Sequence, residues 1–198
     1  MPREIGYNAA EALEHTESDP YRRPAFSLGN RLRRLFWNIC WLLFFRTSPR
    51  PLFEWRAFLL RAFGATIGPH SRIYPACKVW APWNLVCADH VAAGDGVEIY
   101  NPVTIQLGSH VILSQNCYLC GATHDYNDPV FPLIAYTMRL DAHTWVCARA
   151  SVGPGVNIGE GAVLGLGAVA TRTLEPWGVY SGNPAVKVKE RARTGNLA

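Results

Sequence analysis

The residue best suited to acid–base chemistry is His124, which opens the irregular segment "HDYNDPVFPLIAYTMR" at residues 124–139. A neutral imidazole titrates close to physiological pH, so it can accept a proton from a weak nucleophile during attack. Asp125 follows directly, and we expect it to orient the imidazole or to bind substrate. The alternative is that His124 is a structural side chain at the base of a loop. The position of His124 at the start of this segment predicts a general base beside a mobile loop that can cover the substrate.

A metal site is a second kind of chemistry to consider. His110 and His143 fall in the same phase of adjacent turns of the repeat described below, so they could lie close together. A catalytic zinc site of this kind needs three histidines, and no third partner stands out. A ladder of neutral histidine side chains on the surface explains the pair. A zinc carbonic anhydrase-like hydratase is kept only as an alternative.

The cysteines are scattered without the spacing of a metal site. Cys117 and Cys120 form a single CxxC pair with no second pair, so we interpret them as small buried wall residues. No cleavable signal sequence opens the chain, and we therefore expect reduced thiols and a cytoplasmic location.

The elements that must position these residues follow a period of six. Aliphatic residues recur at every sixth position from Ile67 through Leu85, Val91 and Val97, again from Leu107 to Leu119, and again from 140 to 164. The residue four positions later is usually small. Such a repeat is a short flat strand with a corner, and three repeats make one triangular coil. The period predicts a parallel β-helix, whose handedness composition alone does not fix.

The repeat is interrupted twice, by a slip of four residues after Val97 and by the segment that His124 opens. A prism tolerates insertions only at its corners, and a long extruded loop is more often functional than decorative. The solenoid alone proves no activity, so a non-catalytic hexapeptide scaffold remains an alternative.

We divide the chain into three parts: an N-terminal flexible and helical region at 1–64, the β-helix domain at 65–176 with its loop at 124–139, and a C-terminal segment at 177–198. In the first part, "EWRAFLLRAFG" at 54–64 ends in a glycine suited to a helix C-cap. Its apolar side chains, on one helical face, are Trp55, Phe58, Leu59, Ala62 and Phe63.

The N-terminal part is also basic. Between residues 20 and 61 nine arginines stand against one acid, Glu54, around the apolar segment "LFWNICWLLFF" at 35–45. That segment is too short to cross a bilayer, which takes about 20 residues. Either it lies in the interfacial plane of an anionic membrane, or it packs on the β-helix. Nucleic acid is not an expected partner, because no recognition motif accompanies the basic run.

The hexapeptide run resembles the left-handed β-helix acyltransferases. Within them "WNICWLLFFRTSPRPLFEWRAFLLRAFGATIG", "VILSQNCYLCGATHDYNDPVFPL" and "PWGVYSGNPA" are similar to the colanic acid biosynthesis type of O-acetyltransferase, related to the maltose, galactoside and nodulation acetyltransferases. The resemblance spans about residues 25 to 190. It implies an all-β main domain, a left-handed parallel β-helix, with an N-terminal helical region and a short C-terminal tail. It also implies a homotrimer with active sites in clefts between neighbouring prisms.

The resemblance assigns roles to particular residues. The histidine of "GATHDY", His124, is the base, and Asn101 in "EIYNPVTI" resembles an asparagine that contacts the acceptor sugar. The segment "LGLGAVATRTLEPW" resembles the coenzyme A segment of the family. The residues expected there are Ala148 one coil earlier, the backbone of Leu166, the pair Thr171 and Arg172 in place of Thr-Lys, and Lys187 or Lys189 for a phosphate, because Val186 replaces the usual basic residue.

Together these features predict an acetyl-coenzyme A-dependent O-acetyltransferase of a sugar or glycan precursor that uses no metal. The thioester is already activated, so direct transfer needs only a base, proximity and oxyanion donors. An amino-sugar N-acetyltransferase would use the same base. The basic front segment adds the hypothesis of a lipid-linked acceptor and of peripheral contact with the inner membrane face.

Overall fold

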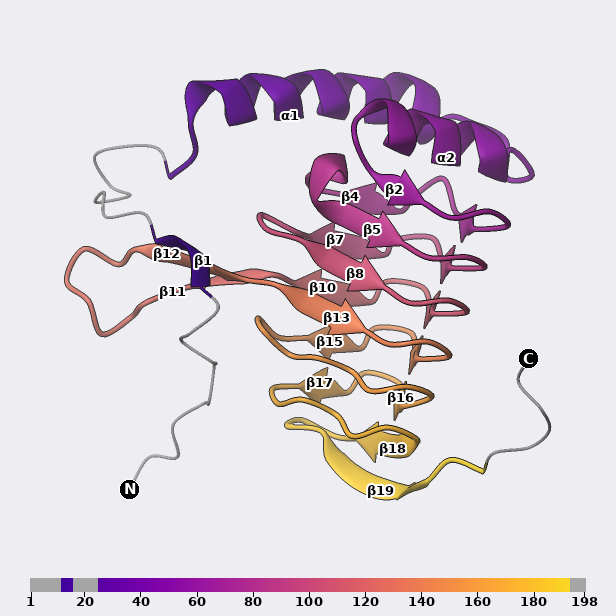
Figure 1. The fold of residues 1–198 in the computed structure, drawn as a ribbon, viewed down its shortest axis with the longest axis vertical. Helices are drawn as coiled ribbons and strands as arrows, with labels where there is room; N and C mark the ends of the chain where they lie inside the picture. Colours follow the sequence, from indigo (N-terminus) through magenta and orange to yellow (C-terminus); the bar gives the residue numbers. More distant parts are fainter. Residues whose placement is uncertain (1–11, 16–24, 193–198) are drawn as a thin grey trace.

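The computed structural model describes residues 12–15 and 25–192, which form a stack of triangular coils with two helices across one end (Figure 1). Each side of the prism is a parallel sheet. The first face contains β2 (Thr66–Ile67), β5 (Leu85–Cys87), β8 (Ile105–Leu107) and β13 (Met138–Leu140). The second contains β3 (Arg72–Ile73), β6 (Ala92–Ala93), β9 (Ile112–Leu113), β14 (Trp145–Val146), β16 (Val163–Leu164) and β18 (Gly178–Ser181). The third contains β4 (Lys78–Val79), β7 (Glu98–Tyr100), β10 (Tyr118–Cys120), β15 (Ser151–Val152) and β17 (Val169–Ala170).

The core is three ladders of inward side chains, one for each face. Every coil contributes one residue to each ladder, and stacking at the interstrand spacing removes these side chains from water. The ladder of the third face shows the pattern, because all of its members are at most 2% exposed: Val79, Ile99, Leu119, Val152 and Ala170. Each strand with its corner takes six residues and contributes one side chain to a ladder, which explains the period of six in the sequence.

The second coil departs from the predicted phase. Its ladder residues are Cys87, Ala93 and Ile99, which pair with Ile67, Ile73 and Val79 in the coil before. The expected residues Leu85, Val91 and Val97 are buried beside them, the two valines at corner positions where the repeat usually has a small residue. The slip of four is in fact two insertions of two residues, one around the short 3₁₀-helix η3 (Pro82–Asn84) and one between Ile99 and Leu107. Larger corner residues offset the smaller ladder residues, so the packed volume is kept.

The helical segment closes the open end of the prism. Ser27 caps α1 (Leu28–Cys40), which continues through the π-helical turn η2 (Trp41–Phe45) and is followed by α2 (Phe53–Ala62). The first coil has no coil above it, so its outer carbonyls need other donors. Side chains of the helices supply them, to one ladder residue on each face: Trp37 Nε1 to Val79 O at 2.7 Å, Arg56 Nε to Ile73 O at 2.5 Å, and Arg61 Nε to Ile67 O at 3.0 Å.

Arg56 is a buried cation that holds this cap together. Its guanidinium also donates to the Ser48 hydroxyl and to the carbonyls of Pro49 and Arg50. Burial lowers the pKa of Arg56. The face predicted for residues 54–64 is split: Leu59 is buried, whereas Trp55 and Phe58 are exposed. Hydrogen bonds to the first coil, which sequence periodicity does not report, decide which side of α2 faces inward.

The other end of the prism and its side carry antiparallel strands. At the far end β19 (Val186–Glu190) pairs with β18, so the parallel stack reaches Ser181, against the predicted end at residue 176. From the side projects a hairpin of β11 (Ala122–His124) and β12 (Leu133–Tyr136), joined by β1 (Ala12–His15) (Figure 1). The rest of the two predicted terminal parts, residues 1–11, 16–24 and 193–198, lies outside the described residues. No helix in the described part of the chain has the length and apolar character needed to cross a bilayer.

Candidate active site

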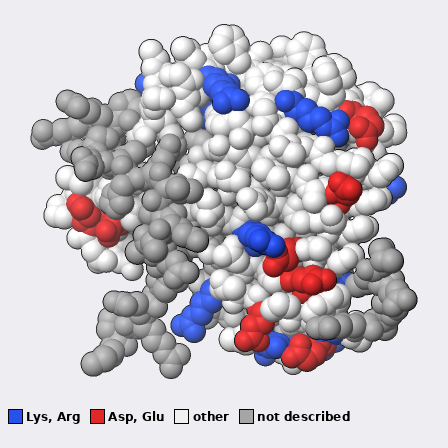
Figure 2. Space-filling view, viewed as in Figure 1, with Lys and Arg blue, Asp and Glu red and all other residues white. Residues whose placement is uncertain are grey.

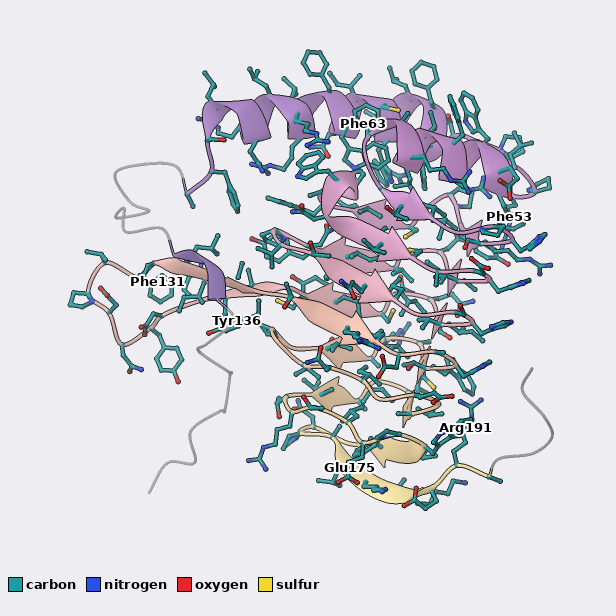
Figure 3. The ribbon with its side chains drawn as sticks, in the orientation of Figure 1. Phe53, Phe63, Phe131, Tyr136, Glu175 and Arg191 are labelled. Atoms are coloured by element: carbon teal, nitrogen blue, oxygen red, sulfur yellow. The ribbon has the colours of Figure 1, made fainter. Side chains whose placement is uncertain are left out.

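The candidate base stands on the hairpin at one corner of the prism. The chain leaves the third face after β10, runs out along β11, returns along β12 and enters the first face at β13. His124 is the last residue of β11 and pairs with Leu133 of β12. In Figure 3 Phe131 lies towards the outer part of the hairpin and Tyr136 nearer to the prism. The sheet pairing fixes the His124 backbone, and its side chain is partly exposed.

The imidazole of His124 has a defined tautomer. Its Nδ1 lies 2.9 Å from the carbonyl oxygen of Phe131, and its ring stacks on the Phe131 ring with centroids 4.6 Å apart and planes 11° apart. A carbonyl oxygen can only accept a hydrogen bond, so Nδ1 carries the proton in the neutral ring. Nε2 is then left with its lone pair, the state that a general base requires.

Asp125 does not orient this ring. Its carboxylate accepts a hydrogen bond from the Asn127 N–H at 2.9 Å, and its own N–H donates to the Pro132 carbonyl. Burial raises the pKa of Tyr136, and the negative charge of Asp125 raises it further. The contact to His124 Nδ1 is made by the Phe131 carbonyl instead, and a substrate contact by Asp125 stays a prediction.

Asn101 is placed inside the prism wall. Its side chain is fully buried, and its amide is paired twice with Ala81: Oδ1 accepts from Ala81 N at 2.9 Å, and Nδ2 donates to Ala81 O at 2.8 Å. This pairing closes the corner at which the two-residue insertions occur. The buried position and this pairing with Ala81 do not favour the predicted sugar contact of Asn101, which stays a prediction.

The residues expected to contact coenzyme A lie at two corners of the third face. Ala148 and Leu166 are neighbours at the corner between the second and third faces, where Gly167 N donates to Ala148 O at 3.0 Å, and Leu166 is 74% exposed. Thr171 and Arg172 follow β17 at the opposite corner, between the third and first faces. The hairpin of His124 leaves from that same corner two coils earlier.

The two lysines lie on β19 at the end of the prism. The Lys187 ammonium is 2.8 Å from a Glu190 oxygen and 3.1 Å from a Glu175 oxygen. Hydrogen bonds to Glu190 and then to Glu175 raise the pKa of Lys187. Its charge is thus already matched by carboxylates, which argues against a phosphate contact. Lys189 is exposed and pairs through its backbone with Val179.

The third face also has a hollow of about 190 Å³ beside the root of the hairpin. Lys78, Glu98 and Tyr118 are register partners on adjacent strands there, and Trp80 packs edge-on against Tyr100. Burial raises the pKa of Tyr118. Sequence reasoning missed this group, because its spacing of 20 residues is visible only once the two insertions are assigned to their corners. Aromatic walls with a few charged groups are typical of small-molecule sites.

Four histidines form a ladder at the corner between the first and second faces. His110 and His143, expected to be close, stack with centroids 4.9 Å apart, and the ladder continues through His90 to His70 at 4.7 and 4.9 Å. All four have φ between 57° and 61°. No group of three side chains able to hold a metal ion is present in the described ranges 12–15 and 25–192. Ring stacking along the corner accounts for the ladder.

Comparison with known proteins gives close matches along most of the chain. The protein designated colanic acid biosynthesis acetyltransferase WcaF of Escherichia coli K12 is 37% identical over 169 residues, which cover 85% of this chain and 93% of that protein.

Two solved structures share the fold. A hexapeptide-repeat acetyltransferase of Vibrio cholerae, solved with acetyl coenzyme A, has a TM-score of 0.76 at 18% identity and covers 84% of this chain and 91% of its own. A galactoside acetyltransferase in complex with coenzyme A has a TM-score of 0.78 at 21% identity and covers 84% of both chains. No protein-family model matches the chain. The predicted fold class, a left-handed parallel β-helix of hexapeptide repeats, is confirmed.

Proposed function

The chain belongs to the colanic acid biosynthesis type of hexapeptide-repeat acetyltransferases, and from this premise we propose that it transfers an acetyl group from acetyl-coenzyme A to a hydroxyl of a sugar or glycan precursor. That the protein is an acyltransferase follows from the family. A sugar or glycan hydroxyl as the acceptor is supported by the relative named for colanic acid biosynthesis and by the structural neighbour named as a galactoside acetyltransferase.

The observation that carries the mechanism is the contact between His124 Nδ1 and the Phe131 carbonyl oxygen. Because Nδ1 is committed as a donor, Nε2 is the basic atom. A hydroxyl is a poor nucleophile near neutral pH, and a positioned base contributes about 10²- to 10⁴-fold to its reaction.

In the proposed reaction Nε2 of His124 accepts the proton of the acceptor hydroxyl while that oxygen attacks the thioester carbonyl carbon. The resulting oxyanion is stabilised by N–H donors of the site. The intermediate then collapses as the carbon–sulfur bond breaks, and the imidazolium returns the proton to the departing sulfur. The products are the O-acetyl sugar and free coenzyme A, and no covalent acetyl-enzyme forms.

The donor is expected along the third face. Ala148 and Leu166 lie at one corner of this face, and Thr171 and Arg172 lie at the other. The Arg172 side chain is exposed, and a guanidinium binds phosphate oxygens in a bidentate way. The hairpin projects away from its own prism, which supports a site shared with a neighbouring prism in a homotrimer.

The test is a mass spectrum of products after incubation with acetyl-coenzyme A and a panel of glycans with hydroxyl or amine acceptors. We expect a mass increase of one acetyl group on a hydroxyl acceptor. Acetylation of amino sugars alone would favour the N-acetyltransferase alternative. Turnover by His124→Ala equal to that of wild type would refute His124 as the base, and no turnover with any of these acceptors would refute the proposed acceptor class.

A further inference from the structure

The helical cap exposes an apolar face that points away from the prism. Along α1 and η2 the exposed apolar residues recur at intervals of three and four, which places them on the side of the helix opposite Trp37 and Phe45. Exposed residues of α2 extend the face. We call this the outer apolar face; its members, each 40–66% exposed, are Leu28, Leu32, Leu35, Phe36, Ile39, Leu42, Leu43, Phe44, Leu52, Trp55 and Phe58.

The two sides of the same helix have different functions. On the inner side the indoles of Trp37 and Trp41 donate to carbonyls of the first coil at 2.7 and 2.8 Å. The outer apolar face makes no comparable contact with the coils, and Figure 3 shows side chains projecting away from the prism along both helices. So much exposed hydrocarbon on one face marks an interaction surface.

The charge around this face is positive. Residues 25–64 contain seven arginines, of which Arg56 is buried and the other six are at least partly exposed, and one acid, Glu54, whereas the rest of the chain has 12 basic and 14 acidic side chains. In Figure 2 the upper rim of the molecule, over α1 and α2, is white, and basic side chains lie just below it. Arginines that border an apolar face attract an anionic surface.

The chemistry of the face favours lipid over protein. Its members are hydrocarbon side chains except for Trp55, and the Trp55 indole N–H already donates to the Phe44 carbonyl at 3.0 Å. A protein interface has about one hydrogen bond per 100–200 Å², and this face has no free side-chain donor to contribute. The acyl region of a bilayer requires none. The 18 residues from Leu28 to Phe45 extend roughly 27 Å, and they lie flat across the end of the prism (Figure 1).

We propose that the outer apolar face docks the enzyme on an anionic membrane surface, with α1 and η2 in the interfacial plane. This inference does not depend on the acetyl acceptor. In the homotrimer proposed above, rotation about an axis parallel to the prisms would bring three such faces to one end. Simultaneous contact by three faces strengthens binding through effective concentration.

The test is flotation of the full-length protein with vesicles. We use phosphatidylcholine vesicles with and without 30% phosphatidylglycerol, at about 50 and 500 mM salt. Wild type is expected to float with the anionic vesicles at low salt and to dissociate substantially at high salt. Absence of flotation with anionic vesicles at low salt would overturn the proposal.

The variant Leu35→Gln/Phe36→Gln/Ile39→Gln removes apolar area and keeps good helix formers, so the fold should persist. We expect its partition coefficient to fall at least tenfold. The matched control is Val86→Gln/Ile112→Gln, because these apolar residues are also exposed, by 37% and 45%, but lie on coil faces. It should float like wild type. Equal flotation of the triple variant and wild type would place the binding elsewhere and refute the docking face.

Two further measurements separate this proposal from other outcomes. Sedimentation in solution would reveal a face covered by a second copy, because wild type would then form a larger species than the triple variant without binding vesicles. Release of coenzyme A with a soluble acceptor should be equal in wild type and the triple variant. Failure of acetyl transfer would leave the vesicle result intact, so the two proposals fail independently.

Discussion

The side chain of His124 is held by Phe131 in two ways at once. The Phe131 carbonyl oxygen lies 2.9 Å from Nδ1, and the Phe131 ring covers one face of the imidazole at a centroid distance of 4.6 Å. Phe131 itself has a φ of 48°, an uncommon conformation for an aromatic residue. Backbone and ring of one hairpin residue thus determine the tautomer and the orientation of the candidate base.

Replacement of the base should abolish most of the turnover. We expect His124→Ala to lower kcat by about 10²- to 10⁴-fold, because no other group is proposed to accept the hydroxyl proton. The measurement is coenzyme A release followed by mass spectrometry. The matched control is His110→Asn, which keeps a residue that tolerates positive φ in the ladder. Similar losses in both variants would indicate a general structural effect rather than catalysis.

Removal of the Phe131 ring should have a smaller effect. Phe131→Ala keeps the carbonyl that accepts from Nδ1 but exposes the face of the imidazole. We therefore expect kcat to fall by about three- to tenfold with little change in KM for acetyl-coenzyme A. Steady-state kinetics in both substrates make the comparison. A loss as large as that of His124→Ala would mean that ring packing, and not only the carbonyl, holds the base.

The donor prediction contrasts two basic residues. Arg172→Gln should raise KM for acetyl-coenzyme A about tenfold with kcat nearly unchanged, because a phosphate contact is present before and during transfer. Lys187→Gln should change KM for acetyl-coenzyme A less than twofold, because Lys187 is ion-paired with Glu175 and Glu190. Steady-state kinetics measure KM and kcat for both variants, and calorimetric titration with coenzyme A checks their binding of the donor. The reverse order of effects would move the phosphate site to β19.

Corner geometry gives a prediction about stability. Gly161 has φ +66°, and an added Cβ would come within 2.6 Å of the Trp177 ring, whereas Gly167 has φ +65° and no atom within 4 Å of such a Cβ. Gly167→Ala should cost only the conformational penalty, about 1–2 kcal/mol, and Gly161→Ala about 1–3 kcal/mol more. Urea unfolding monitored by circular dichroism measures the difference. Equal destabilisation would show that the indole moves aside at no cost.

The buried cysteines predict a pattern of thiol reactivity. Burial raises the pKa of Cys87 and Cys117 to about 12, and it also raises that of Cys77. A raised pKa removes thiolate at any pH below it, so at pH 8 only about one thiol in 10⁴ is ionised at Cys87 or Cys117. Iodoacetamide at pH 8, read by peptide mass spectrometry, should leave these three unmodified and label the partly exposed Cys40, Cys120 and Cys147 first. In urea all should react, and rapid native labelling of Cys87 would contradict the packing described.

Much of the fold follows from the sequence, because in a solenoid the one-dimensional period reports directly which residues point inward. The aliphatic residues of the runs from Leu107 and from Leu140 point inward as the period predicts, and the hairpin leaves the prism at a corner. In the second coil the period was not sufficient: Cys87 and Ala93 are small where the repeat is usually large, and only pairing with adjacent coils reveals the two separate insertions.

The sequence by itself determined the β-helix, the family resemblance, and His124 as the candidate base at the root of an extruded segment. Only the tertiary structure decided that the Phe131 carbonyl fixes the imidazole, that Asn101 closes a corner, and that Trp37, Arg56 and Arg61 cap the first coil. The physical reason is that a period records the direction of each side chain relative to its own strand. Hydrogen bonds between residues 6 to 42 positions apart depend on how strands, hairpin and helices are placed in space.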